Sequence, residues 1–200
     1  GTALANHAVC CTTGPGNRSK LELVYSTEPV TETAEKIIDD AVRYRKDLER
    51  QAGFKSEAAS MLAKSAAQFI SRRESTGGDT ILAGYPFFED WGRDTMIALS
   101  GCALATGRYG TAKRILRTFL KAERNGLMPN LFPEGGSEPM YNTVDAALLF
   151  INSVYLYFER TNDISLVREC CPVMEHIVKQ YETGTDFGIH MDEDGLITAG

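Results

Sequence analysis

The sequence predicts an all-α fold with small β-hairpins, compatible with part of an α/α-barrel. Apolar residues recur at helical spacing over most of residues 31–183. Residues 144–158 are apolar on nearly every side, as a helix buried all round should be, whereas residues 110–124 alternate apolar with charged side chains and have a solvent face. Glycine-containing turns separate two pairs of strand-like segments. Helical periodicity alone does not distinguish a barrel from a bundle or a solenoid.

The chain is expected to contain a connector followed by one folded domain. Residues 1–30 are rich in Thr, Gly, Pro and Asn, which is typical of a turn-rich connector, and residues 31–200 carry the helical pattern. The first amphipathic helix is expected over residues 31–51, with Gly53 at its C-terminal cap. A second helix is expected to open at Ser56.

Two short hairpins are predicted. Gly77 and Gly78 form a turn signal between residues 69–73 and 80–83, whose side chains favour strands. A second hairpin is expected within residues 184–200, where an Asp-Gly pair separates strand-like segments. The first hairpin is expected to deliver the aromatic residues that follow it to the mouth of a cavity.

Further helices are predicted over residues 93–106, 110–124, 143–161 and 164–183. Proline has no amide hydrogen to donate within a helix, and Pro172 stands inside the last of these stretches. The sequence therefore predicts a short helix over residues 164–170 and another that begins near Cys171.

Composition excludes several classes of partner. The 200-residue chain has a formal net charge of −6, whereas nucleic-acid binders concentrate Lys and Arg, so no nucleic-acid partner is expected. No apolar run is long enough to span a bilayer, so no membrane partner is expected either. The five cysteines have the spacing of neither a disulfide framework nor a zinc motif. We therefore expect reduced, buried cysteines, no metal, no cofactor and a cytoplasmic location.

One stretch, residues 83–101, combines aromatic and charged side chains directly before an apolar helical run. It holds Trp91, the only tryptophan, together with Arg93 and the acids Asp90 and Asp94. Aromatic rings stack on the apolar faces of pyranoses, while guanidinium and carboxylate groups hold sugar hydroxyls in fixed geometry. The combination predicts a sugar site. Taken singly, the aromatics are equally compatible with core residues, and Asp90 or Asp94 with a helix cap.

The run GYPFFEDWGRDTMIAL resembles the segment around the WGRD motif in the amylo-α-1,6-glucosidase domain of glycogen debranching enzymes, and more distantly a segment of glucoamylases. Three further blocks follow in the order that this family shows: NGLMPNLF at 125–132, YNTVDAALLFI at 141–151 and GTDFGIHMDEDGLITAG at 184–200. The resemblance covers about residues 55–200. It implies an (α/α)6 toroid barrel of which this chain holds only part, with the C-terminal half absent.

The resemblance implies that Asp145, in the block YNTVDA, is the general acid of an inverting glycosidase. Asp145 is the only charged residue between Thr143 and Phe158. From its position alone, an acid that interacts with the helix dipole or caps the helix is an equally good interpretation. The general base of the family comes from a later part of the barrel, outside this chain.

The resemblance also implies contacts with the substrate. Arg93 and Asp94 would hold hydroxyls of the terminal glucose and Trp91 would stack nearby, while Phe87 stands where relatives often carry Trp. The expected substrate-binding residues are Trp91, Arg93, Asp94, Asp90, Tyr141, Asn142 and Phe87.

Four of the expected site residues lie in or next to loops. Tyr141 and Asn142 precede Asp145 by one turn and are expected to face the same pocket. As an isolated pair, these two residues are also typical of a packed tyrosine and a cap. Asn130 and Glu134 are expected to line the entrance, although a loop rich in Pro and Gly is usually only a loop.

The expected function is hydrolysis of α-1,6-linked glucose at branch points, with glycogen or another branched α-glucan as the partner. The fragment alone is expected to be inactive because its base is missing. A glucoamylase-like exo-α-glucosidase and a non-catalytic glucan-binding module are the alternatives. Self-association is a further hypothesis, because part of a barrel leaves apolar faces uncovered.

Overall fold

The computed structural model describes residues 24, 26, 29–85, 88–133 and 138–199. The chain divides into two compact units, residues 1–47 and 48–200. Helix α1, Ala34–Ala52, begins in the first unit and ends in the second. As predicted, Gly53 follows it with a φ of +65°, the left-handed conformation that ends many helices. The predicted connector lies almost entirely outside the described residues.

Helix α2, Glu57–Phe69, leads directly into the first predicted hairpin. Strand β1, Ile70–Arg72, pairs antiparallel with β2, Asp79–Ile81. The turn between the strands contains Gly77, whose φ of +62° carries no steric penalty for glycine. The first hairpin is therefore confirmed.

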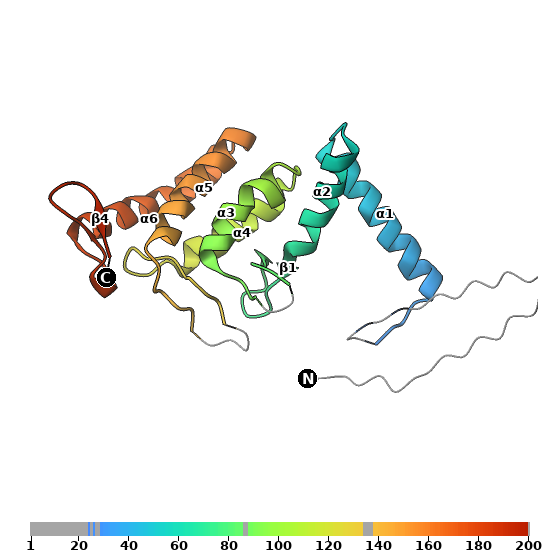
Figure 1. Ribbon diagram of the computed structural model, residues 1–200, viewed down its shortest axis with the longest axis horizontal. Coiled ribbons are helices and arrows are strands. Elements are labelled where there is room, and N and C mark those ends of the chain that lie inside the picture. Colours follow the sequence, from blue (N-terminus) through green and yellow to red (C-terminus); the bar gives the residue numbers. More distant parts are fainter. Residues whose placement is uncertain (1–23, 25, 27–28, 86–87, 134–137, 200) are drawn as a thin grey trace, which may run out of the picture. The chain divides into compact units, whose positions relative to one another are not determined.

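The helices that follow the hairpin build the core of the second unit. They are α3 (Gly92–Leu99), α4 (Tyr109–Ala122), α5 (Asp145–Thr161) and α6 (Ile164–Thr183). Helix α3 continues through a π-helical turn, Ser100–Leu104. Helix α5 packs against α3, α4 and α6, and Figure 1 shows these helices side by side. The buried core includes Ile115, Leu116, Phe119, Met128, Phe150 and Ile177. A mostly helical fold with small antiparallel hairpins is thus confirmed.

The prediction that Pro172 splits the last helix is wrong. Helix α6 runs from Ile164 to Thr183 with Pro172 inside it. A proline removes one backbone N–H and crowds the carbonyl group four residues earlier, which weakens a helix only locally. The buried residues of α6 lie on both sides of the proline: Leu166, Cys170, Ile177 and Tyr181. Packing on α5 and α4 therefore holds the two halves in one helix.

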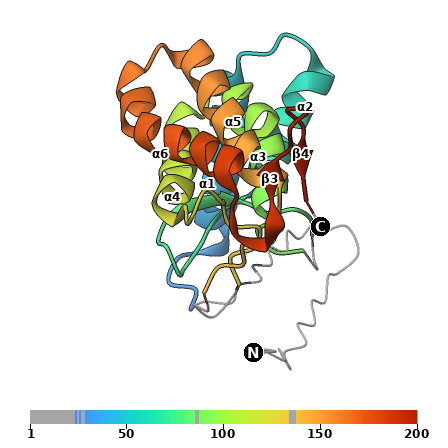
Figure 2. The same ribbon diagram turned by 90° about the vertical axis from the view of Figure 1, so that its left-hand side faces the viewer.

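Helix α5 is not buried on every side within this chain, contrary to the prediction. Leu148 is 39% exposed and Tyr155 55% exposed, and Ile97 on the neighbouring helix α3 is also exposed. Helices α3, α4 and α6 cover the other faces of α5, as Figure 2 shows. No helix in the described part of the chain is both long and apolar enough for a membrane crossing.

The cysteines differ in their surroundings. Cys170 is buried and Cys102 is half-buried, but Cys171 is exposed on α6, so the expectation that the cysteines are buried is wrong for Cys171. Consecutive residues of a helix point about 100° apart, and Cys171 lies outside the face of α6 that buries Cys170. Cys10 and Cys11 lie outside the described residues.

The second predicted hairpin is present at the C-terminal end. Strands β3, His190–Met191, and β4, Ile197–Thr198, pair antiparallel. Asp194 accepts a hydrogen bond of 2.9 Å from the amide of Leu196, and Gly195 has a φ of +81°. The Asp-Gly turn is therefore confirmed.

Candidate active site

The N-termini of two helices lie together in this fold. Helices α3 and α5 run side by side in the same direction, because Arg93 contacts Asp145 near their first residues and Ser153 donates a hydrogen bond of 3.2 Å to the Met96 carbonyl further along. The first turn of a helix has unpaired N–H groups and a partial positive charge. Oxygen-rich groups are favoured in such a place.

Arg93 and Asp145 form an ion pair at this point. Arg93 Nε donates to Asp145 Oδ2 over 2.6 Å, and both side chains are partly open to solvent, with 51% and 42% of their surface exposed. The bond to Asp145 raises the pKa of Arg93. The second carboxylate oxygen, Asp145 Oδ1, is buried and has no hydrogen-bond partner among the described residues. The side chain of Asp145 does not cap helix α5. It accepts its hydrogen bond from Arg93 and not from the backbone of α5.

Asp94 and Trp91 flank Arg93. Asp94 is exposed in the first turn of α3, and its negative charge adds to the rise in the pKa of Arg93. Trp91 is half-buried and extended, with φ −100° and ψ 130°, and no side chain caps the helix at this position. The two polar side chains and the indole ring thus start from three neighbouring backbone positions.

Gly92 fixes this segment against the loop that follows α4. The Gly92 amide donates to the Asn130 carbonyl over 2.7 Å, and Trp91 forms a β-bridge with Leu131. A Cβ atom added to Gly92 would lie 2.0 Å from the Pro129 carbonyl oxygen, which is far inside van der Waals contact. Only glycine therefore allows the start of α3 to approach the loop this closely.

The loop between α4 and α5 is itself cross-linked. The Asn130 amide donates to the Met140 carbonyl over 2.6 Å, and Asn130 Nδ2 donates to Asn142 Oδ1 over 3.0 Å. The Tyr141 hydroxyl donates to the Ala122 carbonyl over 2.7 Å, and Arg124 lies 4.5 Å from the centre of the tyrosine ring. These bonds hold both ends of the loop close to the start of α3.

Comparison with known proteins agrees with this geometry. The profile of the family described as amylo-alpha-1,6-glucosidase matches residues 64–200, which include the whole arrangement around Arg93 and Asp145. The chain belongs to the amylo-α-1,6-glucosidase family. The glycogen debranching enzyme of Saccharomyces cerevisiae is 38% identical over 107 residues, which are 48% of this chain and 7% of that protein. The chain thus spans only a small part of its yeast relative.

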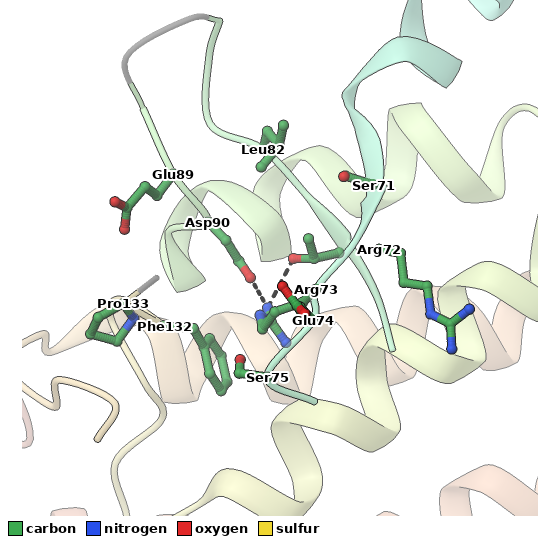
Figure 3. Close-up of a pocket in the computed structure, with 11 residues that line it drawn as sticks. Ser71, Arg72, Arg73, Glu74, Ser75, Leu82, Glu89, Asp90, Phe132 and Pro133 are labelled. Carbon is green, nitrogen blue, oxygen red and sulfur yellow. Dashed lines mark hydrogen bonds and ion pairs between the residues drawn. The ribbon is translucent and has the colours of Figure 1, made fainter. Parts of the chain in front are cut away.

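Asp90 has internal partners in this structure. Its side chain is buried and forms an ion pair with Arg73 (Figure 3), and it also accepts a hydrogen bond of 3.2 Å from Thr95 Oγ1. The Arg73 guanidinium lies 3.8 Å from the centre of the Phe132 ring. Since its carboxylate serves these contacts, Asp90 positions the segment before Trp91 and is not among the side chains that are free to contact a sugar.

Tyr141 is likewise turned to an internal partner. Its hydroxyl is bound at the end of α4, and burial raises its pKa. Asn142 is exposed and is oriented by Asn130, which is the arrangement expected of a residue at the edge of a site. Phe87 and Glu134 lie outside the described residues.

Tyr181 is a residue that the sequence did not single out. It is buried on α6, and its hydroxyl donates to the carbonyl of Val144, the residue before α5. Burial, and secondarily the negative charge of Asp145, raise the pKa of Tyr181 to about 12. Tyr181 therefore stays a neutral donor that holds the start of α5. No local pattern around this tyrosine indicates a contact 37 residues away.

The arrangement can bind hydroxyl groups and offer one carboxyl group to them. Arg93 provides a fork of donors, Asp94 and Asp145 provide acceptors, and Trp91 provides an aromatic face. Among the described residues, no group of three or more His, Cys, Asp or Glu side chains could hold a metal ion.

Proposed function

We propose that the chain is part of a glycoside hydrolase that removes α-1,6-linked glucose from the branch points of glycogen or a similar α-glucan. Membership of the amylo-α-1,6-glucosidase family supports this reaction, and the printed name of the yeast relative supports a branched glucan as substrate. The observation that carries the proposal is the carboxyl group of Asp145, held by Arg93 where two helix N-termini meet.

In the proposed reaction Asp145 is the general acid that protonates the leaving oxygen. A second carboxylate on the opposite face of the sugar activates water, and the configuration of the anomeric carbon inverts. That base would come from residues outside this chain. Trp91, Arg93, Asp94 and Asn142 would bind the terminal glucose.

The ion pair gives Arg93 a second role in this proposal. A general acid has to carry a proton, and Asp145 Oδ2 is occupied by the Arg93 N–H in the free protein. Glucose hydroxyls that accept hydrogen bonds from Arg93 would compete with Asp145 for this donor, so substrate binding would loosen the ion pair.

The proposed architecture is part of an (α/α)6 barrel in a cytoplasmic protein. The exposed apolar side chains of α3 and α5, Ile97, Leu148 and Tyr155, support an incomplete barrel wall. Further helices of the barrel, or a second copy of the chain, would cover them. Size-exclusion chromatography of the 200-residue chain tests the second case, and a monomer at all concentrations would contradict self-association.

The test is glucose release by a full-length protein that contains this chain. The substrates are a limit dextrin with single α-1,6-linked glucose stubs and a linear maltooligosaccharide. We expect glucose from the dextrin with the unmodified protein and with Glu193→Gln, an exposed control, and none with Asp145→Asn. Release from the linear substrate alone would favour a glucoamylase-like enzyme. Binding without release from either would favour a non-catalytic glucan-binding module.

A further inference from the structure

A cavity lies beside the β1–β2 hairpin. It has a volume of about 430 Å³, within the range of roughly 300–1,000 Å³ typical of small-molecule sites. The hairpin, residues 89–90 and residues 132–133 form its wall (Figure 3). Neither Arg93 nor Asp145 lines it, so it is separate from the candidate active site.

A buried arginine forms part of this wall. Arg73 is only 9% exposed, donates to Thr80 Oγ1 over 2.9 Å and forms the ion pair with Asp90. Its Nε atom is buried without a hydrogen-bond partner among the described residues, and burial lowers the pKa of Arg73 to about 10. A buried N–H without a partner costs free energy unless another group accepts it. The Nε atom is closed to solvent, so Arg73 braces the wall from inside through Thr80 and Asp90.

The charges and shapes of the wall select the class of ligand. Two arginines, Arg72 and Arg73, and three acids, Glu74, Glu89 and Asp90, line the cavity, so the formal charge of its wall is −1 and does not favour an anion. The wall also has the hydroxyls of two serines and an apolar part made by a leucine, a phenylalanine and a proline. Such a mixture fits a neutral ligand with many hydroxyl groups and apolar C–H faces.

The cavity shares its supporting segments with the candidate active site. Asp90 lines the cavity and Trp91 follows it directly, while the Phe132 amide donates to the Asp90 carbonyl over 3.4 Å. Asn130, two residues before Phe132, accepts the hydrogen bond of Gly92. A ligand bound in the cavity would therefore contact segments that also hold the candidate active site in place.

We propose that this cavity is an accessory binding site for a glucose unit of an α-glucan chain. Ser71, Ser75 and Glu89 bind its hydroxyl groups, and Leu82 and Pro133 contact its apolar faces. The class of ligand rests on the proposed function, whereas the existence of the site rests on the cavity itself.

The experiment is a titration of the ¹⁵N-labelled 200-residue chain with maltotriose, followed by backbone amide NMR. The amides of Ser71, Ser75 and Leu82 report on the cavity, and those of Arg93 and Asp145 report on the candidate active site. Inorganic phosphate is titrated in parallel as an anionic probe. Two variants change the cavity. One combines Ser75→Ala with Glu89→Gln, and the other, Leu82→Trp, fills the cavity. Glu193→Gln and Arg93→Gln are the controls.

We expect maltotriose to shift the cavity amides with an affinity that falls about tenfold in the double variant, as loss of one or two hydrogen bonds predicts. Both controls should leave the cavity affinity within about twofold, because neither residue lines the cavity. If Leu82→Trp does not fold, the double variant still decides.

Shifts at Arg93 and Asp145 alone would overturn the accessory site and leave the proposed function standing. Shifts at the cavity alone would support the site, and the proposed function is then decided by glucose release from the full-length protein. Shifts with phosphate but not maltotriose, or with neither, would overturn the proposal.

Discussion

Arg93 Nε lies 2.6 Å from Asp145 Oδ2, and this contact joins two residues that stand 52 positions apart in the sequence. It connects the WGRD motif, which opens α3, with the YNTVDA block, which opens α5. Asp145 Oδ1 remains buried and without a partner among the described residues. Arg93, the proposed sugar-binding residue, and Asp145, the proposed general acid, therefore form one unit before any substrate arrives.

Replacing Arg93 is expected to weaken substrate binding without unfolding the protein. In Arg93→Gln the charged donor is lost, so kcat/KM on the branched dextrin should fall about tenfold or more. The side chain is half exposed, so we expect the free energy of unfolding to change by no more than about 0.5 kcal/mol. Steady-state kinetics and urea unfolding measure the two effects. The control is Arg168→Gln on the exposed face of α6, and an equal loss of activity in the control would contradict the assignment.

Gly92→Ala is expected to destabilise the fold. The new methyl group would collide with the Pro129 carbonyl, and forced overpacking of this kind costs about 1–3 kcal/mol. Gly101→Ala is a matched control, because nothing lies within 4 Å of the added Cβ there, and alanine in place of a helical glycine should stabilise by about 0.5–1 kcal/mol. Urea unfolding of both variants measures the difference. Equal stability of the two variants would show that the close approach at Gly92 is not required.

Tyr181→Phe is expected to loosen the start of α5. The variant removes the hydrogen bond to the Val144 carbonyl, which should cost about 1 kcal/mol in the free energy of unfolding. Because Asp145 is the next residue after Val144, kcat should fall as well, with little change in KM. Tyr155→Phe on the exposed face of α5 is the matched control. A loss of stability with unchanged kcat would leave Tyr181 a purely structural residue.

Asp163 is expected to make stability depend on pH. Hydrogen bonds from Lys113 and Ser165 hold the pKa of Asp163 well below its usual range. A carboxyl group whose pKa is lower in the folded than in the unfolded chain stabilises the fold above the unfolded value of about 3.9, and this stabilisation is lost as the pH falls towards the folded value. The variant Asp163→Asn should therefore be less stable than the unmodified chain at pH 7.

The difference in stability between the unmodified chain and Asp163→Asn should shrink below about pH 4. Urea midpoints at pH 7, 5 and 3 measure it, with Glu182→Gln on the same helix as the control. A difference that stays constant over this range would assign the effect to the lost cap on Ser165 instead of to the charge.

Local chemistry explains what the sequence predicted. The hairpin of β1 and β2 follows from two glycines between strand-forming flanks, and the turn before β4 follows from the Asp-Gly pair. The apolar face of α4 follows from residues such as Ile115 and Phe119 at helical spacing. Each of these signals is contained within a few neighbouring residues, so no knowledge of the tertiary structure was needed.

Tertiary contacts explain what the sequence did not predict. Pro172 stays inside α6 because buried residues on both sides of it pack against other helices. Asp90 belongs to the same motif as Arg93, yet a partner from the hairpin, Arg73, takes its carboxylate. The sequence could suggest only that Arg93 and Asp145 line the same pocket. It could not predict the bond between them, because a bond between distant segments leaves no trace in the local pattern.

The most direct test of the role of Asp145 compares two leaving groups in a full-length protein that contains this chain. A glucosidic oxygen needs a proton to depart, whereas the fluoride of α-glucosyl fluoride departs without one. We expect Asp145→Asn to lose glucose release from α-1,6-linked stubs by a factor of about 100 or more and to keep most of its turnover of α-glucosyl fluoride. Equal losses on both substrates would contradict the general-acid role and reduce Asp145 to a partner that positions Arg93.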